Sequence, residues 1–253
     1  MAVQLATGYD RSTKIGQVEP VRSRSRWFWL SMAIVIFVAI FGGFARTYYL
    51  KSFFDTPALI SILHVHGFVF TAWMLLLIVQ TALVAARRTD IHRRLGVAGL
   101  VLAAIVVVVG AITVIDAEKR DLAQGESMRR SVIGVAQQFF FLFAFACGVL
   151  TGLWYRRRPE VHKRWMLFAT VCLMPPGLAR LARNVWPLAS VVVLALLVVG
   201  IVIHDFRTRG RVHPATWGGL LLSFFVFFPV PLATVARSSE TWQRFVSWLL
   251  GQL

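Results

Sequence analysis

The sequence predicts an all-α, polytopic membrane protein with about seven transmembrane helices, on three observations. Hydrophobic residues make up 58% of the 253-residue chain and charged residues only 15%, whereas soluble domains have about 45–50% and about 25%. The mean hydropathy is +0.70. Long uncharged apolar runs recur along the chain, and about 18 such residues cross the roughly 30 Å hydrocarbon core as a helix.

These runs define seven predicted spans within a membrane domain of residues 27–236. Prolines at 175 and 176 in the fifth span and at 229 and 231 in the seventh are expected to bend those helices, because proline removes a backbone donor. Only Arg180 is charged within the spans. The bounds are Trp27–Phe44, Ala58–Ala86, Leu95–Ile115, Val132–Tyr155, Trp165–Leu181, Trp186–Ile203 and Thr216–Ala236.

Two flanking segments are too polar to span the membrane. Residues 1–26 are predicted to form a basic cytoplasmic tail, since no short apolar core and cleavage site of a signal peptide follow its start. Residues 237–253 are predicted to form an amphipathic helix in the membrane interface. Its apolar stripe recurs at helical spacing and consists of Trp242, Phe245, Val246, Leu249 and Leu253.

The distribution of basic residues predicts the orientation. Of the 27 Lys and Arg, 17 lie on the side of the N-terminal tail and 10 on the other. Cytoplasmic loops carry the excess of Lys and Arg, so the N-terminus is predicted to be cytoplasmic in a bacterial inner membrane. The net charge of +16 then indicates contact with anionic lipid headgroups, and not nucleic acid. Other membrane subunits are further expected partners.

Two basic loops match each other at a spacing of 70 residues. Residues 87–94 and 157–164 share the order basic, basic, any, acidic, branched apolar, His, basic, basic. This indicates an internal repeat of a two-helix unit, residues 58–115 and 132–181; the alternative is convergent loop chemistry. The match places His92 and His162 at equal depth on the third and fifth helices.

The paired histidines have two interpretations. Imidazoles on two helices are the ligands that a six-coordinate haem b needs, and Arg87, Arg93 and Arg164 suit its propionates or lipid headgroups. In the alternative interpretation, both histidines point to the cytoplasm among the arginines. The charged loops favour this alternative, because water there competes with an apolar macrocycle.

A second polar group lies in the external half of the predicted bundle. It consists of His66, Gln137, Gln138 and Arg180. Polar groups at membrane depth are functional candidates, so this external cluster predicts a pocket for an anionic or quinone-like head group. The alternative is that its members satisfy one another as interhelical hydrogen bonds.

Several activities are excluded by missing residues. The predicted spans contain no lysine for a retinal Schiff base, and no Asp or Glu of a carboxylate-coupled transporter. No zinc-protease, Cys-x-x-Cys or phosphate-loop motif is present, and no metal site is predicted. His64 and His66 lie about 200° apart around a helix, so they do not chelate one metal.

The histidine motifs resemble those of a group of uncharacterised bacterial multi-pass membrane proteins. They are His64-Val65-His66-Gly67, His92-Arg93-Arg94-Leu95-Gly96 and His162-Lys163-Arg164-Trp165-Met166. The resemblance covers roughly residues 58–182 and implies no known activity. The chain is more weakly similar to four-helix b-type cytochromes and to membrane proteins that assist oxidase maturation, which implies haem b between histidines of neighbouring helices. His64 and His66 share one helix, so a second haem is not implied.

Three functions are consistent with the sequence. The sequence identifies no catalytic residue and does not decide whether the protein is an enzyme. The first is an accessory or assembly subunit of a membrane complex. The second is a redox protein that binds haem b or a quinone. The third is a binder or carrier of a lipid-like or small anionic solute, which the lack of acidic residues in the predicted spans disfavours.

Overall fold

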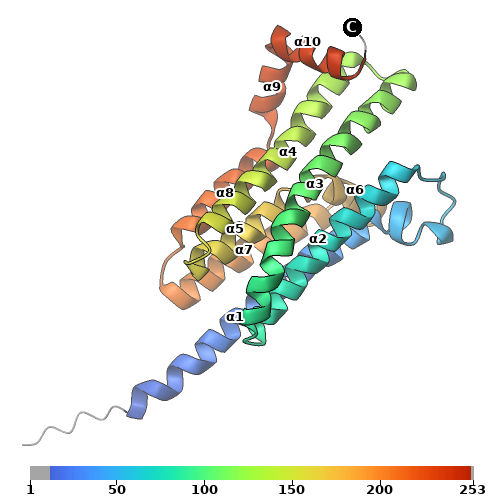
Figure 1. Cartoon of the computed structure of the whole chain (residues 1–253). Helices are drawn as coiled ribbons and strands as arrows, with labels where there is room; N and C mark the ends of the chain where they lie inside the picture. The colour runs from blue at the N-terminus through green and yellow to red at the C-terminus, as the bar shows by residue number, and fades with distance from the viewer. Residues whose placement is uncertain (1–11, 252–253) are drawn as a thin grey trace, which may run out of the picture.

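The computed structural model describes residues 12–251, with side chains from residue 26 onward, and confirms an all-α polytopic membrane protein. Within this range the chain forms helices and turns, with no strand (Figure 1). The elements are α1 Ser12–Phe44, η1 Ala45–Tyr49, η2 Lys51–Phe53, α2 Ser61–Ala85, α3 Thr89–Ala123, α4 Met128–Trp154, α5 Pro159–Val171, α6 Pro175–Asn184, α7 Ala189–Arg209, α8 Pro214–Phe227, α9 Val230–Ser238 and α10 Glu240–Leu249.

Five described helices are long and apolar enough to cross a membrane, and two bent helix pairs raise the number to seven. The pair α5 and α6 bends by 54°, and the pair α8 and α9 by 52°. Both bends fall at the prolines that predicted them. Pro175 opens α6 and Pro229 precedes α9, positions where the missing backbone donor is tolerated.

The first helix begins earlier than the first predicted span. Residues 12–26 of the predicted basic tail continue as the first turns of α1, while residues 1–11 lie outside the described range. Figure 1 shows these turns projecting from one end of the bundle. We call this end the His92 end, because α3 begins there. The opposite end, where α6 lies, is the Arg180 end.

The helices pack around one large apolar core. Each helix from α1 to α4 contacts the next helix along the chain. In addition, α8 packs on α5, and α6 and α7 pack on α1. Side chains of this core with almost no exposed surface come from α1, α3, α4, α5, α7 and α8, and they include Ile36, Val106, Phe145, Leu197 and Val226.

A second, smaller core joins α3, α4, α9 and α10 beyond the main bundle, and we call this part the head. Figure 1 shows the head projecting past the α1–α2 connection. The predicted amphipathic helix forms as α10, whose Val246 is fully buried in the head. Trp242 Nε1 donates to the Val132 carbonyl at 3.1 Å, while Phe245 and Trp248 stay exposed. Thus α10 is fixed to α4 along one edge.

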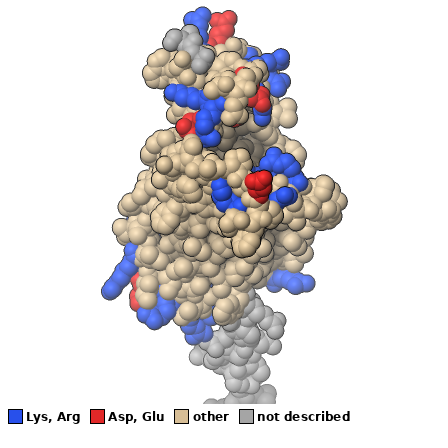
Figure 2. Space-filling view, turned by 90° about the vertical axis from the view of Figure 1, so that its right-hand side faces the viewer, with Lys and Arg blue, Asp and Glu red and all other residues tan. Residues whose placement is uncertain are grey.

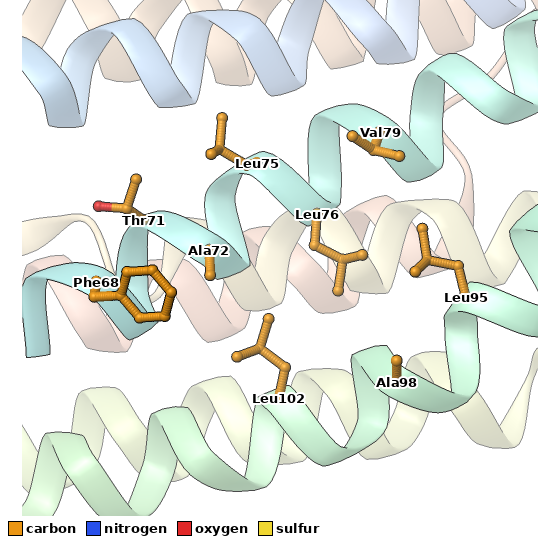
Figure 3. Close-up of a pocket in the computed structure, with 9 residues that line it drawn as sticks. All are labelled: Phe68, Thr71, Ala72, Leu75, Leu76, Val79, Leu95, Ala98 and Leu102. Carbon is orange, nitrogen blue, oxygen red and sulfur yellow. The ribbon is translucent and has the colours of Figure 1, made fainter. Parts of the chain in front are cut away.

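The surface view fits a membrane protein. On the face in Figure 2, charged side chains lie at the bottom, at mid-height and on the narrow upper part, with broad uncharged surface between them. An apolar groove of about 630 Å³ opens sideways between α2 and α3 (Figure 3). Its lining has one hydroxyl, Thr71, among apolar side chains such as Phe68, Leu76 and Leu102. Such a surface suits contact with lipid chains.

Candidate functional site

The first turns of α3 and α5 bring two histidines together at the His92 end. The ring centroids of His92 and His162 lie 6.2 Å apart, and their planes meet at 84°. Both side chains are half-buried. The two matched loops therefore lie at the same end of the bundle, although their origin by duplication stays a prediction.

Each imidazole is held through its Nδ1 atom by a neighbouring helix. His162 Nδ1 lies 2.8 Å from the Gly152 carbonyl oxygen at the end of α4. Gln80 of α2, with its amide turned to suit its neighbours, donates to His92 Nδ1 at 2.5 Å and accepts from Gly96 N–H at 3.1 Å. The two rings thus lie close together, His92 beside α2 and His162 beside α4.

Next to this pair lies a buried charge network centred on Arg164. Its side chain has no exposed surface and forms an ion pair with Asp205 of α7, which is equally buried. Its second terminal nitrogen donates to Glu160 Oε2 at 2.8 Å, and its Nε donates to Thr216 Oγ1 at 3.0 Å. All three nitrogens of the guanidinium therefore have acceptors, as a buried cation requires.

Asp205 connects this network to the start of α8. Its Oδ2 accepts from the Thr216 hydroxyl at 2.6 Å and from the His213 backbone N–H at 3.0 Å. His213 caps α8, because its Nδ1 accepts from Ala215 N–H at 2.9 Å. Burial, followed by the charges of Arg164 and Arg209, lowers the pKa of His213, so the neutral ring that the cap requires is favoured.

The indole of Trp29 on α1 packs against two cations of the network. The Arg164 guanidinium carbon lies 5.1 Å from the ring centroid, and Lys163 Nζ lies 4.9 Å from it. Lys163 also pairs with Glu160 at 2.6 Å. Cation–π contacts of this kind are strongest where water is excluded. The network therefore fixes α1, α5, α7 and α8 to one another at the His92 end.

Sequence reasoning missed two buried acidic residues, because the helices continue past the predicted spans. Asp205 follows the predicted end Ile203 and still lies within α7, and Glu118 follows Ile115 within α3. The predicted spans contain no acidic residue, but the helices α3 and α7 continue beyond those spans and there contain buried acidic residues. The spacing of charged residues indicates the longer helix α7. Asp205 lies four residues before Arg209, and opposite charges at this spacing are typical of one more helical turn.

The three arginines expected near propionates or headgroups lie in different surroundings. Arg93 is exposed, and its Nε donates to the Thr89 carbonyl at 3.3 Å. Arg87 is also exposed and adopts a φ of 62° in the turn before α3. Arg164 is fully buried and paired with Glu160 and Asp205, so it is not accessible to a propionate or a headgroup.

The predicted external cluster divides into two groups at the Arg180 end. The guanidinium of Arg180 lies close enough to the His66 imidazole for their charges to interact. Gln138 instead lies beside α3, where its Nε2 donates to Glu118 Oε1 at 3.4 Å. Glu118 also packs so closely on Gly134 that a Cβ there would lie 2.3 Å from its Oε1. Gln137 is half-buried on the same helix.

Neither a metal cluster nor a known relative defines the site. Within residues 12–251, no three His, Cys, Asp or Glu side chains are placed to hold a metal ion. No family model, curated protein or solved structure matches the chain.

Proposed function

We propose that this multi-pass membrane protein binds haem b at the His92 end, where His92 and His162 would hold the iron. The observation that carries the proposal is the close pair of imidazoles on α3 and α5, 6.2 Å apart between ring centroids. The weaker motif similarity to b-type cytochromes points the same way. The basic loops favour a bacterial inner membrane with this end in the cytoplasm.

The spacing of the rings fits two ligands of one metal. An imidazole nitrogen binds a metal at about 2 Å, and the ring centre lies about 1 Å further on, so two imidazoles that held one metal from opposite sides would have centres roughly 6 Å apart. The Gly152 carbonyl holds His162 Nδ1, which leaves Nε2 free to bind a metal. Partners of this kind orient ligand histidines in metal sites.

His92 requires one adjustment. Gln80 now donates to its Nδ1, which places the proton of a neutral ring on Nε2. To present a lone pair at Nε2, the ring must carry its proton on Nδ1, and the Gln80 amide must turn over to accept it. A bound haem would supply one-electron transfer, while these residues orient the rings and hold their protons.

The test is the visible spectrum of the purified protein, oxidised and then reduced with dithionite, after expression with haem supply. We expect a sharp Soret band that His92→Ala and His162→Ala each abolish. The exposed His64 of α2 is the matched control, and His64→Ala should keep the band. A spectrum without haem, or a band that survives both substitutions, would overturn the proposal.

An accessory or assembly subunit of a membrane complex is the second candidate, and the head favours it. Phe245 is 40% and Trp248 65% exposed on α10, at the edge turned away from α4. Aromatic side chains are enriched in protein interfaces. If haem is not bound, crosslinking from position 248 into a single membrane partner, lost in Trp248→Glu, would support this role. Crosslinking that is unchanged in Trp248→Glu would count against it.

A further inference from the structure

Arg180 is a half-buried cation without an acidic partner in the described part of the chain. One terminal nitrogen donates to the Pro176 carbonyl at 3.1 Å on the preceding turn of α6. The guanidinium carbon lies 4.7 Å from the ring centroid of Phe44 at the end of α1. The ion pairs of the described residues do not include Arg180. This contrasts with Arg164, whose three guanidinium nitrogens all have acceptors.

Two neutral side chains near Arg180 also have unused hydrogen-bonding atoms. His66 Nδ1 is buried and has no hydrogen-bond partner among the described residues, and its ring stacks on Phe70 at 4.0 Å. Asn184 Nδ2 is buried and likewise has no partner there. Asn184 lies one turn after Arg180 on α6, so both project from the same side of that helix.

Close backbone packing fixes these groups in place. A Cβ on Gly43 would lie 2.1 Å from the Gly177 carbonyl oxygen, so α1 and α6 touch through their backbones. A Cβ on Gly67 would lie 2.2 Å from the ring of Tyr48, which packs on α2 beside His66. The three groups are thus held by α1, α2 and α6 and do not depend on flexible loops.

We propose that Arg180, His66 and Asn184 bind the phosphate of an anionic ligand at the Arg180 end. A cation withdrawn from water is costly unless it is paired, and the arginine fork matches phosphate oxygens with two hydrogen bonds. Asn184 Nδ2 and the Nδ1–H of the neutral His66 ring donate to the remaining oxygens. The position at one end of the apolar bundle suits an anionic phospholipid, whose phosphate lies where the hydrocarbon ends.

Thermal unfolding of the delipidated protein in neutral detergent tests this site independently of haem. Phosphatidylglycerol at about 100 times its Kd should raise Tm by about 5–10 °C, and phosphatidylcholine should not. Inorganic phosphate that gives the same shift would identify a free anion as the ligand. Equal shifts with both lipids would overturn the proposal.

Substitutions on α6 and α2 have matched controls. Arg180→Met should abolish the shift and leave the Tm of lipid-free protein unchanged or higher, because it removes an unpaired cation. Arg183→Ala should keep the shift, since Arg183 is exposed on the same helix. His66→Ala should reduce it, and His64→Ala should not. If Arg180→Met lowers the lipid-free Tm and retains the shift, Arg180 has only a structural role.

Discussion

Asp205 shows how a single buried carboxylate organises one end of this membrane protein. Its two oxygens accept from Arg164, from the Thr216 hydroxyl and from the backbone of His213. These donors belong to α5, α8 and the turn before α8. A buried ion pair is weak evidence of net stability, but the further hydrogen bonds of Asp205 with Thr216 and His213, and of Arg164 with Thr216 and Glu160, make its geometry specific.

Removal of either partner of the Arg164–Asp205 pair should destabilise the protein strongly. Arg164→Met and Asp205→Leu should each cost about 3–5 kcal/mol, because the remaining charge is buried and unpaired. The double variant should recover a large part of that loss, and thermal unfolding of all four proteins gives the coupling energy. Arg209→Ala removes a partly exposed cation 3.8 Å from Glu160 and should have little effect. If the double variant loses as much stability as the sum of the two single variants, the pairing is contradicted.

His213 should make stability depend on pH. Its folded-state pKa lies below the ordinary value of 6.5, so the unfolded chain binds more protons in the acid range. The stability that His213 contributes is therefore present above about pH 6.5 and is lost as pH falls toward the folded-state pKa. His213→Asn keeps a capping acceptor without this titration, so it should lose less Tm between pH 7.5 and 5.5 than wild type. Equal losses would show that His213 does not titrate in this way.

At the scale of elements, the contact of α1 with α6 depends on the absence of side chains at two glycines. Gly43→Ala should force α6 away from α1, because its Cβ would lie 2.1 Å from a backbone oxygen that cannot rotate aside. The expected cost is about 1–3 kcal/mol of unfolding free energy. Gly200→Ala is the control, since its Cβ meets only the side chains of Met32 at 3.7 Å and Phe28 at 3.9 Å, and it should be neutral or slightly stabilising. A neutral Gly43→Ala would contradict the close contact.

The bends could be predicted from the sequence, but the helix ends could not. Proline acts locally, so Pro175 and Pro229 mark the breaks without knowledge of the tertiary structure. Hydropathy marks where a span leaves lipid, and a helix continues further wherever another helix covers it. This is why the ends of α3 and α7 were placed too early, and why Glu118 and Asp205 were missed.

The sequence predicted a common depth for the two histidines, but neither the closeness of their rings nor their surroundings. Equal loop spacing placed His92 and His162 at one depth, which needs no packing information. The partners of Arg164 and Gln138 lie on other helices, at Asp205 and Glu118. Such pairs depend on how the helices rotate against each other, and that rotation is set by side-chain packing over the whole bundle.

For the whole molecule, the charge asymmetry predicts that the His92 end faces the cytoplasm. In a background without Cys147 and Cys172, Gln124→Cys should react with a membrane-impermeant maleimide in spheroplasts. Thr208→Cys should react only after the membrane is permeabilised. Both positions are exposed, one at each end of the bundle, so each serves as the control for the other. The reverse pattern would invert the topology.

The length of α3 affects what can approach the Arg180 end from water. With 35 residues and a rise of 1.5 Å each, α3 is roughly 50 Å long, against about 30 Å of hydrocarbon. Its last turns therefore extend beyond the hydrocarbon together with the first turns of α4 and with α10. A large soluble protein that approaches this surface contacts the head before it reaches the membrane. The residues around Arg180 on α6 are thus less accessible to large proteins in water than to molecules that diffuse laterally within the bilayer.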